Sequence, residues 1–274
     1  TGIKTGLNNI NILRIINGIL NSDLYSYFIL HTASTIGIER EQVHDFEKWN
    51  TPFVYNDVNA SLVENLEKVS KQLYSKNNVL NSNRNDLDKK REKLISLLNQ
   101  EIFRSYQLND MELALVDYSR SILVPLIMKQ ENMYKDILSA IHFKSDVLVK
   151  YINIFFSRFK RSLKGKRLVA EVYFTESIIG VFFRVVSKKN PGKNGIVWNE
   201  IRNVELLKKI ISLGVEEIST SLFIQKDIRG FERDGFYIIK PNEKKLWHLV
   251  NGYLDANDFM DSILREGRRI YSEQ

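Results

Sequence analysis

The densest group of basic side chains in the sequence lies between residues 158 and 167. It contains six basic residues and no acidic one, in a chain whose net charge is +7, and Phe155, Phe156 and Phe159 are interleaved with its start. Clustered cations beside aromatic rings suit binding of a phosphate backbone, although cations at a helix end also stabilise the helix dipole. We therefore predict contact with DNA, with a plain solvated helix end as the alternative. The basic residues of the group are Arg158, Lys160, Arg161, Lys164, Lys166 and Arg167.

A second polar segment covers residues 225–248. It combines two glycines, a charged hairpin and the pair Trp247-His248, and its six basic side chains against four acidic ones leave it two charges positive. Such a segment would dock a phosphate backbone or a protein partner, or would form a salt-bridged turn held by Trp247. The candidates for DNA contact in this segment are Lys226, Arg229, Arg233, Lys244 and Lys245.

The residue types of the common catalytic and cofactor sites do not come together in the sequence. His31, His44, His142 and His248 lack the spacing of a helical zinc site, and there is no phosphate-binding loop, dinucleotide fingerprint or Gly-x-Ser-x-Gly elbow. The absence of cysteine excludes disulfides and thiolate sites and suits the reducing cytoplasm. No apolar stretch has the length of a membrane span. We expect no catalytic residue, no metal site and no membrane contact in this chain.

One arrangement faintly resembles a metal-dependent nuclease. Glu171 and Glu176 are followed by Lys188 and Lys189, and in such nucleases acids hold Mg²⁺ while a lysine assists the attacking water. The spacing departs from the usual acid-x-lysine strand. Solvent-facing charges on a half-exposed sheet are the favoured interpretation, and a nuclease is the third hypothesis for function.

The first part of the chain is predicted to be helical. Apolar residues at three- and four-residue spacing indicate a helix over residues 10–35, broken after residue 20 so that Ser22 caps a second helix. Ser61 and Glu64 have the spacing of a capping box at the start of a long, charged, leucine-containing stretch. That stretch would form two antiparallel helices or one long helix with a coiled-coil seam.

After Gly165 the chain changes to short runs of β-branched and aromatic residues. Two neighbouring runs predict a hairpin across residues 175–177. The predicted fold class is α+β: a mostly helical part with a long helical spacer at residues 1–128, then a helical connection and a small module with an antiparallel sheet at residues 129–274. The further expected helices are 111–124, 132–163, 205–213, 244–253 and 256–265, and the expected strands are 168–174, 178–186, 222–225 and 236–239.

Two segments of the helical part, residues 19–28 (ILNSDLYSYF) and 97–116 (LLNQEIFRSYQLNDMELALV), have a distinctive pattern. The first is similar to an LNS-x-L-x-x-Y helix, and the second to an ending of the form LYGL-[TS]-x-E-E after a helical spacer. Both occur in the target-recognition region of N6-adenine DNA methyltransferases of restriction–modification systems, in type I modification subunits and fused type IIG enzymes. The resemblance covers about residues 10–120, and Gln107 stands where the family pattern has glycine.

The resemblance implies a non-catalytic part that recognises and positions double-stranded DNA. The family's Asn-Pro-Pro-Tyr motif and its glycine-rich S-adenosylmethionine (SAM) loop are absent, so SAM and methyl transfer would belong to an upstream domain. The chain opens on Thr1, as expected for a piece of a longer protein. We interpret the region beyond about residue 128 as an appended module of the kind seen on methyltransferase-like proteins of phage defence. The competing hypothesis is an assembly subunit whose long helices bind a protein partner or form a homo-oligomer.

Overall fold

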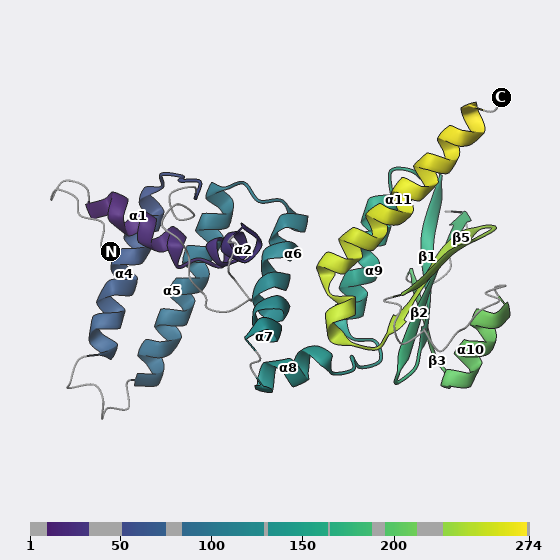
Figure 1. Ribbon diagram of the computed structural model, residues 1–274, viewed down its shortest axis with the longest axis horizontal. Helices are drawn as coiled ribbons and strands as arrows, with labels where there is room; N and C mark the ends of the chain where they lie inside the picture. The colour runs from purple at the N-terminus through teal and green to yellow at the C-terminus, as the bar shows by residue number, and fades with distance from the viewer. Residues whose placement is uncertain are drawn as a thin grey trace. The chain divides into compact units, whose positions relative to one another are not determined.

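The structure is a computed structural model of the 274-residue chain. It forms two compact units, Thr1–Met128 and Lys129–Gln274. The first unit is helical and the second combines a sheet with helices, so the fold is α+β as predicted (Figure 1). The described residues are 10–32, 51–74, 84–128, 131–163, 165–187, 195–212 and 227–272. Among the helices in these ranges, none has the length and apolarity needed to cross a membrane.

The first unit begins with two short helices separated by a capped turn. α1 (Ile10–Leu20) ends in the turn, and α2 (Asp23–Thr32) begins directly after Ser22. The backbone N–H of Tyr25 donates to Ser22 Oγ at 3.1 Å, which satisfies one of the free donors at the helix start. The predicted break and its capping residue are confirmed.

The next helix starts earlier than its predicted capping box. Asn56 caps α4 (Asp57–Leu73), and its side chain accepts from the N–H of Val58 at 2.8 Å. Ser61 therefore lies inside the helix, and the prediction that Ser61 and Glu64 start it is wrong. Asparagine is as good an N-cap residue as serine, and Asn56 precedes Ser61 in the chain, so the helix starts at the asparagine.

α4 and α5 (Arg84–Ser105) lie side by side as an antiparallel pair (Figure 1). Val63 of α4 packs with Leu98 and Ile102 of α5 in a buried cluster. Of the two alternatives for this stretch, the antiparallel pair is therefore the one that forms.

The helix predicted to end before Pro125 runs through it. α6 (Asp110–Tyr118) continues into a π-helical turn, η3 (Ser119–Leu123), and then into α7 (Val124–Ile127). Proline lacks an N–H and collides with the carbonyl of the preceding turn in an α-helix, whereas the wider π turn accommodates it. The helix therefore continues past the residue that was expected to stop it.

The second unit is built on a five-stranded sheet with the order β3-β1-β2-β5-β4. β1 and β2 form the predicted hairpin, and β3 runs parallel to β1 while the other neighbours are antiparallel. The sheet is thus mostly antiparallel. Its strands are β1 (Lys166–Phe174), β2 (Ile178–Ser187), β3 (Ile196–Glu200), β4 (Ile228–Glu232) and β5 (Gly235–Pro241).

Helices cover both faces of this sheet (Figure 1). α9 (Asp146–Phe159) and α11 (Leu249–Ser272) lie on one face, and α10 (Asn203–Ser212) lies on the other. Alternate residues of β1, from Leu168 to Phe174, are buried against α9 and α11. The period-two pattern of the sequence therefore corresponds to a strand with one face in the main core.

Several predicted boundaries in this unit are wrong. The helix expected over residues 132–163 is two helices, α8 (Glu131–Leu138) and α9, separated by a loop. The two helices expected over residues 244–265 are a short 3₁₀ turn, η5 (Lys244–Trp247), and the single helix α11. β3 and β4 were not predicted, and the strand expected over residues 222–225 lies outside the described residues.

Candidate nucleic-acid interface

A basic hollow of about 800 Å³ lies along the flank of α9, beside the edge strand β3. Its described lining contains four basic side chains and two aromatic rings, and no carboxylate is among the described residues that line it. The volume is in the range of sites that bind small ligands. The basic side chains are Lys144, Lys160, Lys166 and Arg167, and the rings are Phe156 and Trp198.

One flank of α9 supplies the wall of the hollow. Asn153, Phe156 and Lys160 recur at three- and four-residue spacing, so they project from the same side of the helix. Tyr151 and Phe155 project from another side and are fully buried in the core, which fixes the rotation of the helix. Lys160 caps the helix C-terminus, where a cation is also favoured by the helix dipole.

A tight turn after α9 brings two further cations to the same end of the hollow. Gly165 adopts φ 72, a left-handed conformation that glycine enters without strain. The N–H of Lys166 donates to the carbonyl of Leu163 at 2.7 Å, and Lys166 and Arg167 then form the start of β1. Lys166 is exposed and Arg167 is half-buried.

Gly195 lets the edge strand approach α9. A Cβ at this position would stand 3.1 Å from the ring of Phe156, closer than ordinary van der Waals contact. The carbonyl of Gly195 accepts from the N–H of Ala170 at 2.7 Å, which starts the pairing of β3 with β1. A side chain at this position would therefore crowd the Phe156 ring at the point where it lines the hollow.

The other end of the hollow is formed by a strained turn before α9. Lys144 has φ 59, in the left-handed region that costs a residue with a side chain about 1–2 kcal/mol. Its Nζ lies 5.2 Å from the centroid of the Phe143 ring, and Phe143 packs edge-on against Trp198 with centroids 5.8 Å apart. The turn before α9 therefore places Lys144 at the hollow and also supports the Trp198 ring through Phe143.

Four basic and two aromatic residues line the hollow. The sequence analysis named three of them, Lys160, Lys166 and Arg167, as candidates for DNA contact, and it noted Phe156 beside the basic group. It missed Lys144, for which no sequence pattern signals a left-handed backbone. It also missed Trp198, although the β-branched residues before it, following a glycine- and proline-containing loop, were a usable strand signal.

Two other cations of the 158–167 group, Arg158 and Arg161, are not among the residues that line the hollow. The guanidinium of Arg158 lies 5.6 Å from the centroid of the Tyr253 ring on α11, a cation–π distance. Arg161 is exposed in the turn after α9. Lys164 lies outside the described residues. The group is contiguous in sequence, but only some of its described members line the hollow.

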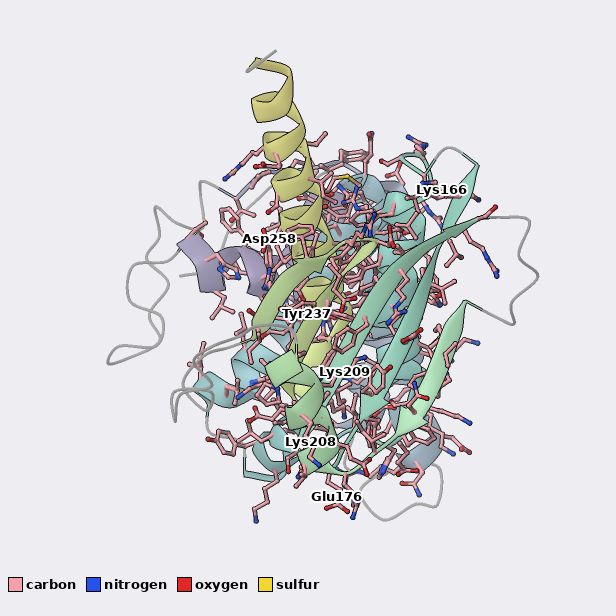
Figure 2. The ribbon with its side chains drawn as sticks, turned by 90° about the vertical axis from the view of Figure 1, so that its right-hand side faces the viewer. Lys166, Glu176, Lys208, Lys209, Tyr237 and Asp258 are labelled. Atoms are coloured by element: carbon pink, nitrogen blue, oxygen red, sulfur yellow. The ribbon has the colours of Figure 1, made fainter. Side chains whose placement is uncertain are left out.

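The predicted contacts of the second segment are divided between the two ends of the sheet. Lys166 pairs with Ser187 at one end, and Pro241 pairs with Ile178 at the other. Figure 2 shows Lys166 and Glu176 at these opposite ends. Lys244 and Lys245 follow Pro241 and therefore lie away from Lys166.

Those two lysines are paired with carboxylates. Lys244 binds Asp136 at 2.5 Å, and Lys245 binds Glu243 at 2.9 Å. Arg233 is exposed in the turn between β4 and β5, and this turn lies at the Lys166 end because the Asp234 carbonyl accepts from the N–H of Val185. Lys226 lies outside the described residues.

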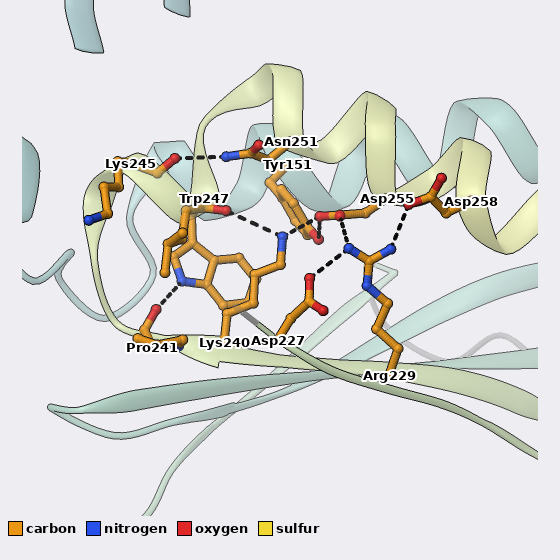
Figure 3. Close-up of polar contacts among 11 residues, drawn as sticks. Tyr151, Asp227, Arg229, Lys240, Pro241, Lys245, Trp247, Asn251, Asp255 and Asp258 are labelled. Atoms are coloured by element: carbon orange, nitrogen blue, oxygen red, sulfur yellow. Dashed lines mark hydrogen bonds and ion pairs between the residues drawn. The ribbon is translucent and has the colours of Figure 1, made fainter. Parts of the chain in front are cut away.

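Arg229 lies within a network of acids rather than on the hollow (Figure 3). Its guanidinium binds Asp227 at 2.6 Å, and Asp255 and Asp258 of α11 at 2.8 Å each. Burial alone would lower the pKa of Arg229, but these three carboxylates outweigh it and raise the pKa. The positive charge of Arg229 is therefore largely compensated inside the unit.

Lys240 is the buried centre of the same network (Figure 3). It binds Asp255, which also accepts from the Tyr151 hydroxyl at 2.6 Å. Its Nζ lies 5.2 Å from the Tyr151 ring centroid and 5.6 Å from that of Trp247. Burial lowers the pKa of Lys240, while the charge of Asp255 opposes this shift. Lys240 and Asp255 were not singled out in the sequence, because their pairing depends on α11 packing on the sheet.

The acids of the nuclease hypothesis lie apart. Glu171 accepts from the Tyr173 hydroxyl at 3.1 Å and lies 3.6 Å from Arg184. Glu176 is exposed in the turn after β1 (Figure 2), and the strand residues between them rise about 3.3 Å each. Lys188 and Lys189 lie outside the described residues. No group of three or more metal-binding side chains is found in the described part of the chain.

The hollow therefore brings four basic side chains and two aromatic rings to one surface. The network around Lys240 joins α11 to the sheet, and none of its residues lines the hollow. The cations of the network are paired with carboxylates inside the unit, whereas no carboxylate is among the described residues that line the hollow. No family model, curated protein or solved structure matches the chain.

Proposed function

We propose that this chain is a non-catalytic, DNA-binding part of an adenine-specific DNA methyltransferase or of a related phage-defence protein. The observation that carries DNA binding is the basic hollow, where four cations line one surface without a carboxylate among its described residues. Such a surface attracts phosphates and releases their counterions. In this proposal the protein acts in the cytoplasm, and SAM binding and methyl transfer belong to another domain.

The turn after α5 supports the methyltransferase resemblance. Gln107 adopts φ 55, a left-handed conformation, at the position where the resembled motif has glycine. The N–H groups of Gln107 and Leu108 donate to the carbonyls of Arg104 and Phe103, which is the hydrogen-bond pattern of a glycine-type helix end. The backbone here is thus the one that the family's glycine would favour.

The helix start that follows supports the same resemblance. Asn109 accepts from the N–H of Glu112 at 3.1 Å, and the carboxylate of Glu112 accepts from the N–H of Asn109 at 2.8 Å. This is a capping box, formed where the resembled motif has Ser or Thr followed three residues later by Glu. Asn109 replaces the hydroxyl residue with an equivalent acceptor.

The proposed role of the cations is to position double-stranded DNA. Lys160 and Lys166 are exposed at one end of the hollow, where they would each neutralise a phosphate. Phosphate contacts give affinity and register but no sequence choice. Selection of a target sequence would then need further contacts to base edges, made by residues other than these cations.

The test is salt-dependent binding of a fluorescent duplex by the full chain. Affinity should fall steeply between about 50 and 200 mM salt, because each neutralised phosphate contributes about −0.9 to the logarithmic salt slope. The double variant Lys160→Gln, Lys166→Gln should reduce this slope by about 2.

Lys208→Gln is the matched control. Lys208 is an exposed lysine of α10, on the opposite face of the sheet (Figure 2), so the salt slope should not change. Duplex affinity without salt dependence, or an equal loss for Lys208→Gln and for the double variant, would contradict the proposal.

An assembly role for the long helices has less support. Leu62 and Leu66 of α4 pack with Leu98 of α5 inside the antiparallel pair, so these leucines are used within one chain. Leu87 and Leu94 are half-buried. If the chain shows no salt-sensitive DNA affinity but forms an oligomer that Leu87→Asp or Leu94→Asp dissociates, the assembly hypothesis replaces the proposal.

A further inference from the structure

We propose that the basic hollow prefers unpaired nucleotides, so that a short single-stranded segment binds it more tightly than the phosphate backbone of an intact duplex does. This inference rests on the proposed function and specifies the form of nucleic acid that occupies the same site. The inference is based on one arrangement: basic side chains lie along a concave surface, and Trp198 and Phe156 form part of its wall.

The concavity favours a single strand. A duplex presents phosphates on a convex outer surface and keeps its bases stacked inside, so its base faces cannot reach rings in the wall of a hollow. An unpaired nucleotide exposes the face of its base together with its phosphate. Proteins that bind single strands combine a positively charged groove with aromatic side chains on which bases stack. The hollow has both features.

The two rings are held in place by their neighbours. Trp198 packs edge-on against Phe143, and Phe156 projects from α9 opposite Gly195, where there is no side chain to displace it. Both rings are partly exposed at the hollow rather than fully buried in the core. Rings fixed in this way lose little freedom when a base stacks on them.

The cations are placed at both ends of the hollow. Lys144 precedes α9, whereas Lys160 and Lys166 follow it. The helix between them has 14 residues, which corresponds to about 21 Å. A backbone of a few nucleotides that runs along α9 would therefore meet a cation at each end with the aromatic wall between them.

The left-handed backbone of Lys144 is a further feature of the hollow. A side-chain-bearing residue with φ 59 is disfavoured, and Asn or Gly would adopt this conformation at lower cost. Left-handed residues other than glycine that are retained despite their cost cluster at functional sites. Lys144 is such a residue, and it lines the hollow.

The experiment measures anisotropy of three fluorescent probes with the full chain: a short oligothymidylate, a short oligouridylate and a hairpin duplex of matched phosphate number. The oligothymidylate should bind about tenfold more tightly than the duplex. Trp198→Leu should remove most of this preference and leave duplex affinity unchanged, whereas Trp198→Phe should retain it, because stacking of one base contributes about a tenfold effect.

Lys144→Asn gives a second readout that does not depend on the tryptophan variants folding. It removes one cation and relieves the left-handed strain, so single-strand affinity should fall severalfold while the unfolding midpoint stays the same or rises. A residue with a merely structural role would lose stability together with affinity. Lys208→Gln, on the opposite face of the sheet, should change neither quantity, because lysine and glutamine have similar helix propensities.

The outcomes separate this inference from the proposed function. Equal, salt-dependent affinity for single strand and duplex, unchanged by Trp198→Leu and Lys144→Asn, would overturn the inference and leave duplex binding standing. Absence of salt-dependent binding to every probe would overturn both. Much tighter binding of oligouridylate than of oligothymidylate would support the single-strand site and overturn the choice of DNA.

Discussion

Lys240 of β5 donates a hydrogen bond to Asp255 of α11, and both side chains are almost completely buried. Two opposite charges withdrawn from water are tolerated only when their geometry and remaining hydrogen bonds compensate for lost hydration. Here Asp255 also accepts from Tyr151 and Arg229. One carboxylate thus joins α9, β4 and β5 to α11, and the consequences of removing it differ from those of removing any one of its partners.

Asp255→Asn should destabilise the second unit more than Lys240→Met. The asparagine leaves the Lys240 ammonium buried without an anion, which costs about 3–5 kcal/mol. The methionine removes that ammonium and leaves Asp255 with Arg229 and Tyr151, so the expected cost is about 1–2 kcal/mol. Urea unfolding followed by circular dichroism measures both. The opposite order of the two variants would show that the ammonium, not the carboxylate, is the organising group.

The hydroxyl of Tyr151 should make stability depend on pH in the alkaline range. Burial, with the charge of Asp255 added, raises the pKa of Tyr151 well above its ordinary value of 10.0. The folded chain therefore keeps this proton where the unfolded chain loses it, so the contribution is complete below pH 10.0 and declines as the pH rises further.

The measurement is the difference in unfolding free energy between wild type and Tyr151→Phe, followed between about pH 8 and pH 11. Lys240 is present in both proteins, so most of its own titration cancels in the difference. The advantage of the wild type should be constant at first and then shrink. A difference that grows with pH would mean that Tyr151 ionises more easily in the folded chain.

Arg229→Gln should lower stability without changing the salt slope for DNA. Its guanidinium is held by Asp227, Asp255 and Asp258, so its removal weakens the packing of α11 on the hairpin of β4 and β5. The side chain is 28% exposed, which reduces the expected cost to about 1–3 kcal/mol. Salt titration of duplex binding, run beside urea unfolding, measures both quantities. A reduced salt slope would place Arg229 among the phosphate contacts after all.

The parts of this fold that were predictable depend on patterns within one element. Residues of β1 alternate between buried and less buried, and the two strands of the β1–β2 hairpin are rich in β-branched and aromatic residues. Both features can be predicted from the sequence of the strands alone. β4 is different. It contains Gly230 and two charged residues, and its strand conformation depends on pairing with β5 and on the acids that bind Arg229. A polar strand of this kind has no local signal that distinguishes it from a loop.

The residues of the candidate site also fall into those that the sequence predicts and those that depend on tertiary packing. Lys160, Lys166 and Arg167 were found because they are adjacent in the sequence and lie on a short turn between α9 and β1. Lys144 and Trp198 reach the hollow only through a left-handed residue and through the parallel pairing of β3 with β1. Sheet pairing over long sequence distances and single backbone conformations are set by tertiary packing. Three of the cations could therefore be predicted from the sequence, whereas the concave shape of the surface that they line could not.

Gln107→Gly should stabilise the first unit. Gln107 has φ 55, which costs a residue with a Cβ about 1 kcal/mol and costs glycine nothing in the folded state. Glycine also has more freedom in the unfolded chain, and this offsets part of the gain, so the expected net effect is a few tenths to about 1 kcal/mol. Gln107→Ala is the control: alanine keeps the Cβ and should give no gain. Urea unfolding of the three proteins measures the difference. A Gly variant less stable than the Ala variant would contradict the left-handed strain, and similar losses for both variants relative to the wild type would mean that the glutamine side chain stabilises this turn.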